Sequence, residues 1–505
     1  MKCCLCCHFL SKKFNGLLIL RIELNYHVET NTTMKPLLMG LVAIYSIFAV
    51  IGCHNTQQEL SSIEPASTTT PNIIFILSDD QRFDALGVAG NPILKTHYLD
   101  SLANNGVYFP NACATSAICC VSRASILTGQ YARRHNIVDF NTNFSNAAFE
   151  QTYPMLLKNA GYYTGFIGKF GVGEDAPKDK FDFWRGFNGQ GHYQCKDEKG
   201  KSIHLLKQNE SEITEFFNKY ADNTAPFFLQ VSFKSPHAED EKEAGEEFVT
   251  DPAYNCFYNN IQWQLPEAAK PAYFNYFPKV FTANNEGRKR WEKRFSSPYL
   301  INKTMQGYYR LIHQMDDVIG NLLAQLRAKK LDKNTIVIFA SDNGYYYGEY
   351  GLADKWYGSS PSIRIPLIVY DPRPKAPHGF KNKAMALNID IAPTILNFAH
   401  VPVPDKMQGK PLMELDKIEK RQDFFYEHLW MYKDIYIPST EGIVGQQYKY
   451  MRYFKGLDST HLMFEELYDL KTDPNEINNL MGQTKWESLK DSLQNRMWAL
   501  KKMVK

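Results

Sequence analysis

Pro71-Asn-Ile-Ile-Phe-Ile-Leu-Ser-Asp-Asp80 is a continuous apolar run with β-branched residues, and a polar cluster stops it. Such a run is typical of a strand that is buried on both faces of a parallel sheet. Asn334-Thr-Ile-Val-Ile-Phe-Ala-Ser-Asp-Asn-Gly344 repeats this design far along the chain. Both predicted strands deliver acidic residues at their carboxyl ends, which is where open α/β sheets place their ligands. The two stretches therefore indicate an α/β fold with a polar site at one edge of its sheet.

Further apolar runs predict strands at residues 164–167, 227–233 and 366–370. The clearest helix is expected over residues 303–330, where large apolar residues keep a spacing of three and four. The pair Asp316-Asp317 on this helix is interpreted as a solvated or structural feature. It is not counted among the metal ligands.

Four hard oxygen ligands stand at the ends of the two matched strands: Asp79, Asp80, Asp342 and Asn343. Clustered carboxylates repel one another unless a cation neutralises them, and calcium prefers oxygen ligands. Two apolar strands that end in Ser-Asp-Asp and Ser-Asp-Asn-Gly predict a calcium site between them.

A second stretch, Ser116-Ala-Ile-Cys-Cys-Val-Ser-Arg-Ala-Ser-Ile-Leu-Thr-Gly129, carries a cysteine next to an expected helix start. Ser122 can cap a helix that begins at Arg123, and Gly129 can close it. A group at such a helix start faces unpaired backbone N–H donors, and Arg123 adds a charge that suits a tetrahedral oxyanion. The alternative is that Cys119 is a small core residue in a turn, because cysteine packs well in protein interiors.

This second stretch resembles the signature of the type I, formylglycine-dependent sulfatases, a family of the alkaline-phosphatase-like superfamily. The resemblance implies that a formylglycine-generating maturation enzyme oxidises Cys119 and that the product is the nucleophile. It also implies that Arg123 binds the sulfate group. Val121 stands where the family usually has proline or alanine. The metal ligands that the resemblance implies, for one calcium ion, are Asp79, Asp80, Cys119, Asp342 and Asn343.

Three more motifs match the family in order. Lys169 lies in Phe166-Ile-Gly-Lys-Phe-Gly-Val-Gly173, which resembles a family segment whose histidine is replaced here by Gly171. His237 ends an apolar run and matches a Ser-Pro-His segment whose histidine protonates the leaving group. Lys355 matches the family lysine that follows the metal-binding Asp-Asn pair. The resemblance thus implies catalytic roles for Lys169, His237 and Lys355.

The resemblance covers residues 71–480 and implies a large, mixed, mostly parallel sheet flanked by helices, with a smaller C-terminal antiparallel-sheet subdomain. We therefore expect a catalytic domain over residues 71–420 and a C-terminal subdomain over residues 421–505. Residues 240–300 are rich in aromatic and charged residues. We expect this segment to be a substrate-recognition insert, with Trp263, Arg288 and Arg290 as substrate-binding residues. The alternative is a surface excursion packed by its own aromatic side chains.

The N-terminal part is expected to carry a targeting signal. Residues 34–52 have the pattern of a lipoprotein signal peptide, followed by Cys53 as the lipidated residue and a polar tether over residues 53–70. Residues 1–33 precede a better start at Met34 and are interpreted as a misread upstream start. The protein is then secreted and lipid-anchored to the outer membrane, periplasmic or at the cell surface. An uncleaved membrane anchor is the alternative.

The net charge of +3 over 505 residues gives no indication of a nucleic-acid partner. The expected activity is hydrolysis of sulfate esters on a sulfated polysaccharide or oligosaccharide, with algal material such as ulvan favoured. One alternative is a phosphate mono- or diester hydrolase of the same superfamily, since phosphate and sulfate are both tetrahedral. The other is a non-catalytic surface protein that binds glycans and keeps an unconverted cysteine.

Overall fold

The computed structural model describes residues 70–197, 199–220, 223–415, 421–429, 436–456 and 461–505. The chain divides into two units, Met1–Pro65 and Ala66–Lys505. The predicted signal peptide, the lipidation site Cys53 and the tether up to residue 69 lie outside the described residues. Among the helices that are described, none has both the length and the apolar character needed to cross a membrane.

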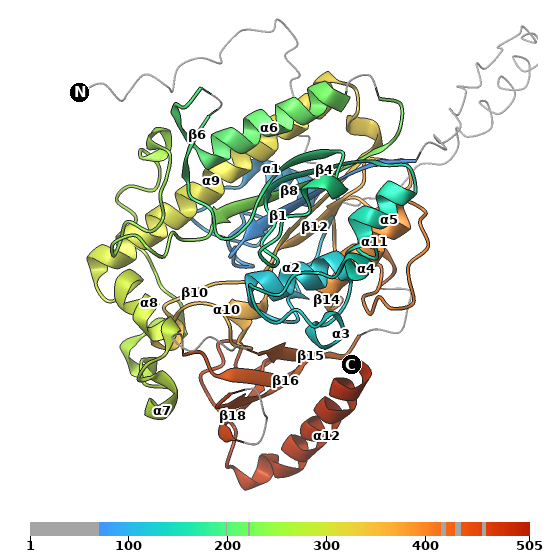
Figure 1. Cartoon of the computed structure of the whole chain (residues 1–505). Helices are drawn as coiled ribbons and strands as arrows, with labels where there is room; N and C mark the ends of the chain where they lie inside the picture. Colours follow the sequence, from blue (N-terminus) through green and yellow to red (C-terminus); the bar gives the residue numbers. More distant parts are fainter. Residues whose placement is uncertain (1–69, 198, 221–222, 416–420, 430–435, 457–460) are drawn as a thin grey trace, which may run out of the picture. The chain divides into compact units, whose positions relative to one another are not determined.

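The described part of the second unit is built on an eight-stranded sheet of order β13-β2-β12-β9-β1-β8-β4-β5 (Figure 1). Strand β1 (Asn72–Asp79) lies between β8 (Phe227–Pro236) and β9 (Thr335–Ser341) and is parallel to both. Strand β12 (Leu367–Tyr370) runs antiparallel to β9. The sheet is thus mixed and mostly parallel, as expected from the sequence. Its remaining strands are β2 (Val107–Tyr108), β4 (Tyr163–Lys169), β5 (Phe183–Phe187) and β13 (Phe380–Lys381).

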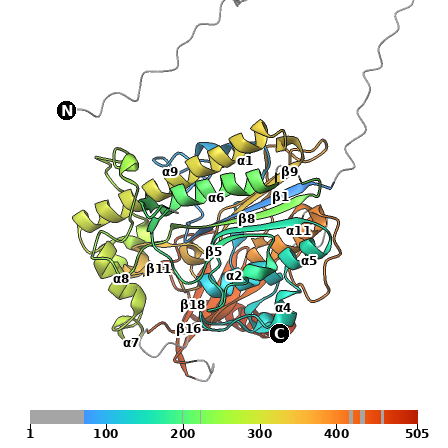
Figure 2. The same ribbon diagram turned by 45° about the horizontal axis from the view of Figure 1, so that its top comes forward.

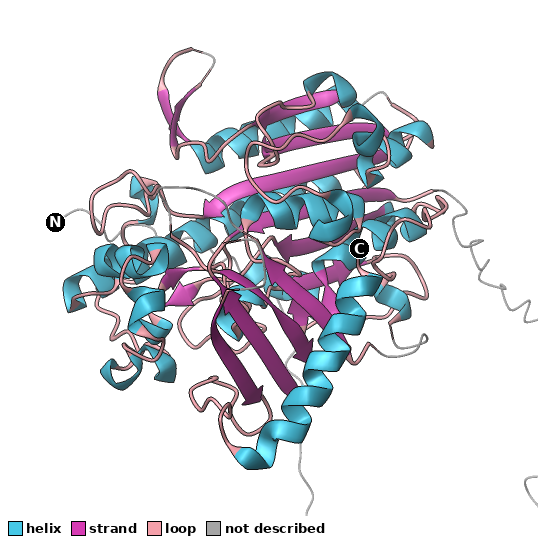
Figure 3. Cartoon of the chain, turned by 60° about the horizontal axis from the view of Figure 1, so that its bottom comes forward, coloured by secondary structure: helices cyan, strands magenta, loops and turns pink. Residues whose placement is uncertain are grey.

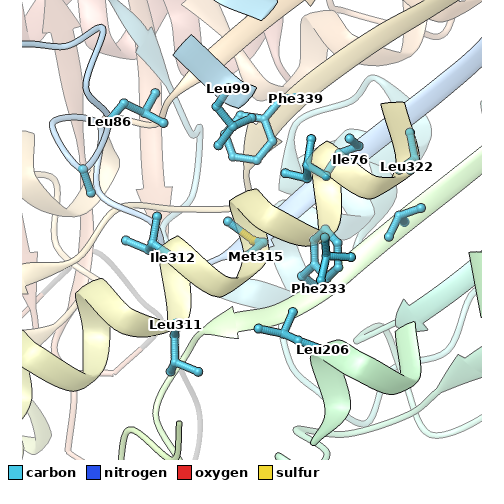
Figure 4. Close-up of a cluster of buried hydrophobic side chains, with 14 of the residues drawn as sticks. Ile76, Leu86, Leu99, Leu206, Phe233, Leu311, Ile312, Met315, Leu322 and Phe339 are labelled. Atoms are coloured by element: carbon cyan, nitrogen blue, oxygen red, sulfur yellow. The ribbon is translucent and has the colours of Figure 1, made fainter. Parts of the chain in front are cut away.

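Helices cover both faces of this sheet (Figures 1 and 2). Alternate residues of β1 point to opposite sides, so that Ile74 and Ile76 join one core cluster while Ile73 and Phe75 join another. The first cluster includes residues of α1, α6 and α9, and Figure 4 shows Ile76 of β1 and Met315 of α9 as members of this cluster. The second includes α2, α5 and α11. Burial on both faces explains why β1 is apolar without alternation.

The helices of the described residues have the following bounds: α1 His97–Asn104, α2 Cys119–Thr128, α3 Ala132–His135, α4 Asn146–Phe149, α5 Tyr153–Asn159, α6 Leu205–Tyr220, α7 Lys279–Thr282, α8 Glu286–Arg294, α9 Pro298–Ala328, α10 Ser360–Ile363, α11 Ile391–Phe398 and α12 Glu487–Met503. Helix α9 begins earlier than predicted because Ser297 caps it by accepting the backbone N–H of Leu300. Asp316 of α9 is buried and accepts the backbone N–H groups of Tyr98 and Leu99. Asp316 therefore has a structural role, which was one of the two interpretations of the Asp316-Asp317 pair.

A second sheet lies near the C-terminus, with four antiparallel strands in the order β15-β16-β17-β18 (Figure 3). These strands are β15 (Asp423–His428), β16 (Ser439–Gly445), β17 (Tyr448–Phe454) and β18 (Leu462–Asp469). Met497 and Leu500 of α12 join the core cluster that contains Ile443 of this sheet. The expected C-terminal antiparallel sheet is therefore present, while the boundary at residue 420 stays a prediction. Short paired strands complete the set: β3 (Ala112–Cys113), β6 (Gln194–Lys196), β7 (Ser202–His204), β10 (Tyr346–Tyr347), β11 (Ala353–Asp354) and β14 (Ala386–Leu387).

Candidate active site

The carboxyl ends of β1 and β9 bring together four side chains that are fully buried: Asp79, Asp80, Asp342 and Asn343. The two strands pair in register from Asn72–Thr335 to Ser78–Ser341, so their polar ends meet at one level of the sheet. The backbone N–H of Asp80 donates to Asp342 Oδ1 at 3.1 Å, and Asn343 Nδ2 donates to Asp80 Oδ1 at 2.7 Å. Segments more than 250 residues apart in the chain therefore form one acidic cluster.

Helix α2 presents Cys119 to this cluster from its first turn. The Sγ atom of Cys119 lies 3.2 Å from Asp79 Oδ1 and 3.9 Å from Asp80 Oδ1, and the residue is 1% exposed. The predicted cap at Ser122 is wrong, because Ile118 is the N-cap and the helix begins at Cys119. Ser122 instead donates its hydroxyl to the backbone carbonyl of Asp342. A tertiary contact thus replaces the local cap, whereas Gly129 closes the helix in the left-handed region as expected.

Arg123 ties helix α2 to three strands. Its Nε donates to Asp342 Oδ2 at 2.9 Å, and its Nη1 donates to the carbonyl of Lys169 and to Ser232 Oγ. Its Nη2 lies 3.3 Å from Asp79 Oδ2 but makes no hydrogen bond, although it is buried. The two N–H groups of Nη2 therefore stay available for an anion.

Two lysines and a histidine complete the cluster. Lys169 Nζ pairs with Asp79 Oδ2, and Lys355 Nζ lies 2.5 and 2.6 Å from the two carboxylate oxygens of Asp80. His237 Nδ1 lies 2.6 Å from the carbonyl of Ala238, which can only accept, so this nitrogen carries the proton. Nε2 of the same ring lies 3.6 Å from Asp80 Oδ2 and faces the site. The structure thus gathers all five residues for which catalytic roles were expected.

Burial and neighbouring charges shift the pKa values of the acid groups of the site in different directions. Burial alone would raise the pKa of Asp79, but the positive charges of Lys169 and Arg123 hold it well below its usual range. Burial, together with the neighbouring Asp79 carboxylate and against the charge of Lys355, raises the pKa of Asp80 to about 7. Burial and the Asp79 carboxylate also raise the pKa of the Cys119 thiol well above its usual value. As an unmodified thiol, Cys119 is therefore a poor nucleophile at neutral pH.

The donor set fits a calcium ion. One ligand atom each from Asp79, Asp80, Cys119 and His237 can be chosen so that all lie within 4.8 Å of one another. Asn343 Oδ1 is buried and has no hydrogen-bond partner, which is costly unless a cation or donor meets it. Carboxylate and amide oxygens are the ligands that calcium prefers. The residues that could hold the ion through oxygen are Asp79, Asp80, Asp342 and Asn343, and the residue at position 119 lies close enough to be the fifth ligand that the resemblance implies.

Gly171 stands where the resemblance expects a histidine, and the structure shows why this loop excludes a side chain. Its φ is +70°, and a Cβ atom built there would lie 2.9 Å from Arg123 Cδ and 3.3 Å from Lys169 Cε. A side chain at this position would strike the two cations that flank the nucleophile. The side chains of Arg123 and Lys169 therefore occupy the space that a side chain at position 171 would need.

Sequence reasoning missed four residues around the cluster: Gln190, Tyr193, Ser232 and Lys234. Gln190 Oε1 accepts from Lys169 Nζ at 2.6 Å, and Tyr193 donates its hydroxyl to the carbonyl of His237. Lys234 is buried, makes no ion pair within the described ranges, and has its Nζ 5.2 Å from the centroid of the Tyr193 ring. Burial lowers the pKa of Lys234 to about 8. Ser232 and Lys234 are polar residues within the otherwise mostly apolar run of β8, and this break in the sequence pattern could have marked them as residues of a polar site.

The predicted substrate-binding residues of the insert make contacts of their own. Arg290 pairs with Asp354, Asp240 and Glu286. Arg288 lies 3.7 Å over the Phe274 ring, and Trp263 Nε1 donates to Asn302 Oδ1 at 3.0 Å. Within the part of the chain that the structure describes, none of the three has a contact with the acidic cluster. Their role toward a substrate stays a prediction.

The cysteines of the described residues are all free: Cys113, Cys119, Cys120, Cys195 and Cys256. Cys119 is the one that lies within 4 Å of the Asp79 and Asp80 carboxylates.

Comparisons with known proteins agree along most of the chain. The family model described as sulfatase matches residues 71–401, and the model for the C-terminal part of N-sulphoglucosamine sulphohydrolase matches residues 348–503. The chain is 27% identical to an N-acetylglucosamine-6-O-sulfatase of Bacteroides thetaiotaomicron, over 93% of this chain and 91% of that protein. It is also 27% identical to an ulvan-active sulfatase of Formosa agariphila, over 92% and 87%.

Solved structures give the same fold. The structure of BT4656 in complex with its substrate D-glucosamine-2-N,6-O-disulfate is 25% identical, with a TM-score of 0.71 over 86% of this chain and 98% of that chain. A phosphonate monoester hydrolase of Agrobacterium radiobacter also superposes with a TM-score of 0.71, over 86% of this chain and 96% of that chain. At 19% identity, this second likeness shows the fold alone.

Proposed function

Because the chain belongs to the sulfatase family and is therefore a sulfate ester hydrolase, we propose that it acts on a sulfated glycan with Cys119, converted to formylglycine, as its nucleophile. One observation carries the proposal. Cys119 lies at the first turn of α2, between the Asp79 and Asp80 carboxylates and beside Arg123, Lys169 and Lys355. A nucleophile among three cations is what displacement on a tetrahedral anion requires.

The chain's own residues supply most of the chemistry. Lys169, Lys355 and the N–H groups of Arg123 Nη2 stabilise the sulfate oxygens, whose charge grows in the transition state. His237 keeps its Nδ1 proton on the Ala238 carbonyl and turns Nε2 toward the site. Burial and the charge of Lys355 hold the pKa of His237 well below its usual value, so Nε2 is unprotonated in the resting site. This nitrogen would first take up a proton within the site and then pass it to the departing sugar oxygen. The sheet edge and α2 bury the reacting groups and exclude water from them.

Two groups that the family implies would complete the site. Asp79, Asp80, Asp342 and Asn343 would hold a calcium ion, which supplies Lewis-acid stabilisation of an oxyanion and favours an ionised nucleophile. Formylglycine at position 119 supplies, in its hydrated form, one hydroxyl for attack on sulfur and a second whose deprotonation releases sulfate. The raised pKa of the Cys119 thiol supports the need for this conversion.

The relatives support a glycan as the substrate and leave the sugar open. An enzyme named for N-acetylglucosamine 6-O-sulfate and one named for ulvan are equally similar to this chain. An algal polysaccharide such as ulvan therefore stays one prediction, beside an amino sugar sulfated at O6. Secretion, lipidation at Cys53 and anchoring to the outer membrane are proposed from the N-terminal sequence pattern alone.

Peptide mass spectrometry across residues 114–123 tests the nucleophile, on protein produced together with a formylglycine-generating enzyme. We expect a mass loss at Cys119 and none at Cys120, which is buried in the same helix and serves as an internal control. The same preparation should cleave an aryl sulfate far faster than the matching aryl phosphate, and the Cys119→Ala variant should cleave neither. Unmodified Cys119 in fully active protein, or preferential cleavage of the phosphate, would overturn the proposal.

A further inference from the structure

A cavity of about 450 Å³ lies between the short strand β3 of the catalytic part and the β16–β17 turn of the C-terminal sheet. Its polar lining consists of Asn111, Ser360, Arg364, Lys383 and Gln446. Its apolar lining includes Ile363, Met385 and Leu470. No residue of the catalytic cluster lines it, so this cavity is separate from the site described above.

The charges of this cavity are all positive. The lining residues include Arg364 and Lys383 and no carboxylate. Neither cation forms an ion pair within the described ranges. Arg364 is held in place because its guanidinium lies 3.7 Å over the Phe83 ring and its Nη2 donates to the carbonyl of Pro110. Its remaining N–H groups are free to bind an anion.

The acid that contacts the lining residue Ser360, Glu476, is already paired with a lysine. Glu476 accepts the backbone N–H and the hydroxyl of Ser360, and it pairs with Lys449 at 2.7 Å. It therefore does not neutralise Arg364 or Lys383. An anion that entered the cavity would meet two uncompensated cations, two side-chain amides and an apolar wall.

We propose that this cavity is a second, non-catalytic binding site for an anionic sugar unit, one pyranose ring that carries a sulfate or a carboxylate. Cations and amides suit the anion and the hydroxyls, and the apolar wall suits the C–H face of the ring. The assignment of an anion rests on the charges of the cavity, whereas the assignment of a sugar rests on the proposed function.

The neighbouring surface supports a chain rather than an isolated sugar. A second cavity of about 810 Å³ shares Ser360, Arg364 and Pro474 with the first and has Trp263 on its wall. Its two acidic residues, Asp84 and Glu349, both pair with Arg82 and so carry no uncompensated negative charge. An oligosaccharide anchored at Arg364 can therefore extend toward Trp263, whose ring can stack on a sugar. A second contact of this kind raises the effective concentration of a polymeric substrate at the enzyme.

Binding stoichiometry tests the proposal. The probe is N-acetylglucosamine 6-sulfate, measured by calorimetry on the full chain with Cys119→Ser, so that the probe is not consumed. We expect two binding events per chain. Lys383→Gln and Arg364→Gln should each weaken one event about tenfold or more and leave the other unchanged. The control Lys381→Gln removes an exposed lysine that does not line the cavity and should leave both events unchanged.

Separate outcomes judge the two parts of the proposal. The site would be overturned if no binding event of the parent protein is weakened by Lys383→Gln or Arg364→Gln, whereas a single event that both variants weaken would locate the sugar in the cavity alone. Inorganic sulfate that binds the second site as tightly as the sulfated sugar would overturn the sugar assignment. The matured enzyme with Lys383→Gln should keep its turnover of an aryl sulfate, so a failure of the sulfatase function is detected independently. Should Arg364→Gln fail to fold, Lys383→Gln alone decides, since its side chain is exposed.

Discussion

A methyl group at Gly171 would test how closely the loop after β4 sets the position of the anion-binding arginine. The Cβ atom of Gly171→Ala would lie 2.9 Å from Arg123 Cδ and 3.3 Å from Arg123 Nε. Ordinary contacts of this kind begin at 3.4 Å, so Arg123 has to move by about 0.5 Å. Arg123 cannot move alone, because it holds Asp342, Lys169 and Ser232 through hydrogen bonds.

The substitution carries two costs of different kinds. A left-handed backbone costs a residue with a side chain about 1–2 kcal/mol, which lowers the free energy of unfolding. The displaced guanidinium lowers catalysis instead. Since a misplacement of 1 Å can cost about 100-fold in rate, a shift of half that size should lower kcat/KM for an aryl sulfate by about tenfold.

Gly161→Ala provides the matched control. Gly161 also has a left-handed backbone, with φ of +92°, but a Cβ atom there meets nothing within 4 Å. This control should lose similar stability in urea unfolding and keep its kcat/KM. The reasoning is refuted if Gly171→Ala keeps full kcat/KM, or if Gly161→Ala loses as much kcat/KM as Gly171→Ala does.

Three further predictions concern charge. Lys355→Met should lower kcat for an aryl sulfate by about 100-fold or more, because Asp80 and the substrate lose a buried cation. Lys355→Arg keeps the positive charge and should retain part of the activity. Equal kcat values for the two variants would contradict this role of the charge. Removal of calcium by a chelator should lower Tm and abolish turnover, and added calcium should restore both; an unchanged Tm would argue against the metal site. Burial raises the pKa of Glu466 to about 7. The folded carboxyl therefore keeps a proton that the unfolded chain releases near pH 4.5. The free energy of unfolding should fall as the pH rises between these two values. Glu466→Gln should flatten this slope in urea unfolding at pH 5 and pH 8, and an unchanged slope would contradict the assignment.

The sequence predicted those parts of the site that follow from local pattern. An apolar run that ends in acidic residues places those residues at a sheet edge, and this placed Asp79 and Asp342 correctly. The contacts of Ser122 and Gln190 were not predictable in this way, because their partners Asp342 and Lys169 come from distant segments. The same holds for Arg290, whose acidic partner Asp354 follows it by more than 60 residues. Side-chain partners across the chain depend on the packing of whole elements, which local spacing does not encode.

The burial of Cys119 sets an order of events during biosynthesis. Its thiol is covered once β1 and β9 pair, and that pairing joins the beginning of the folded unit to a strand more than 250 residues later. Contacts of such sequence separation form late, since the intervening chain has to be made and closed first. Any enzyme that converts Cys119 must therefore reach it before these strands pair and the unit closes around the thiol.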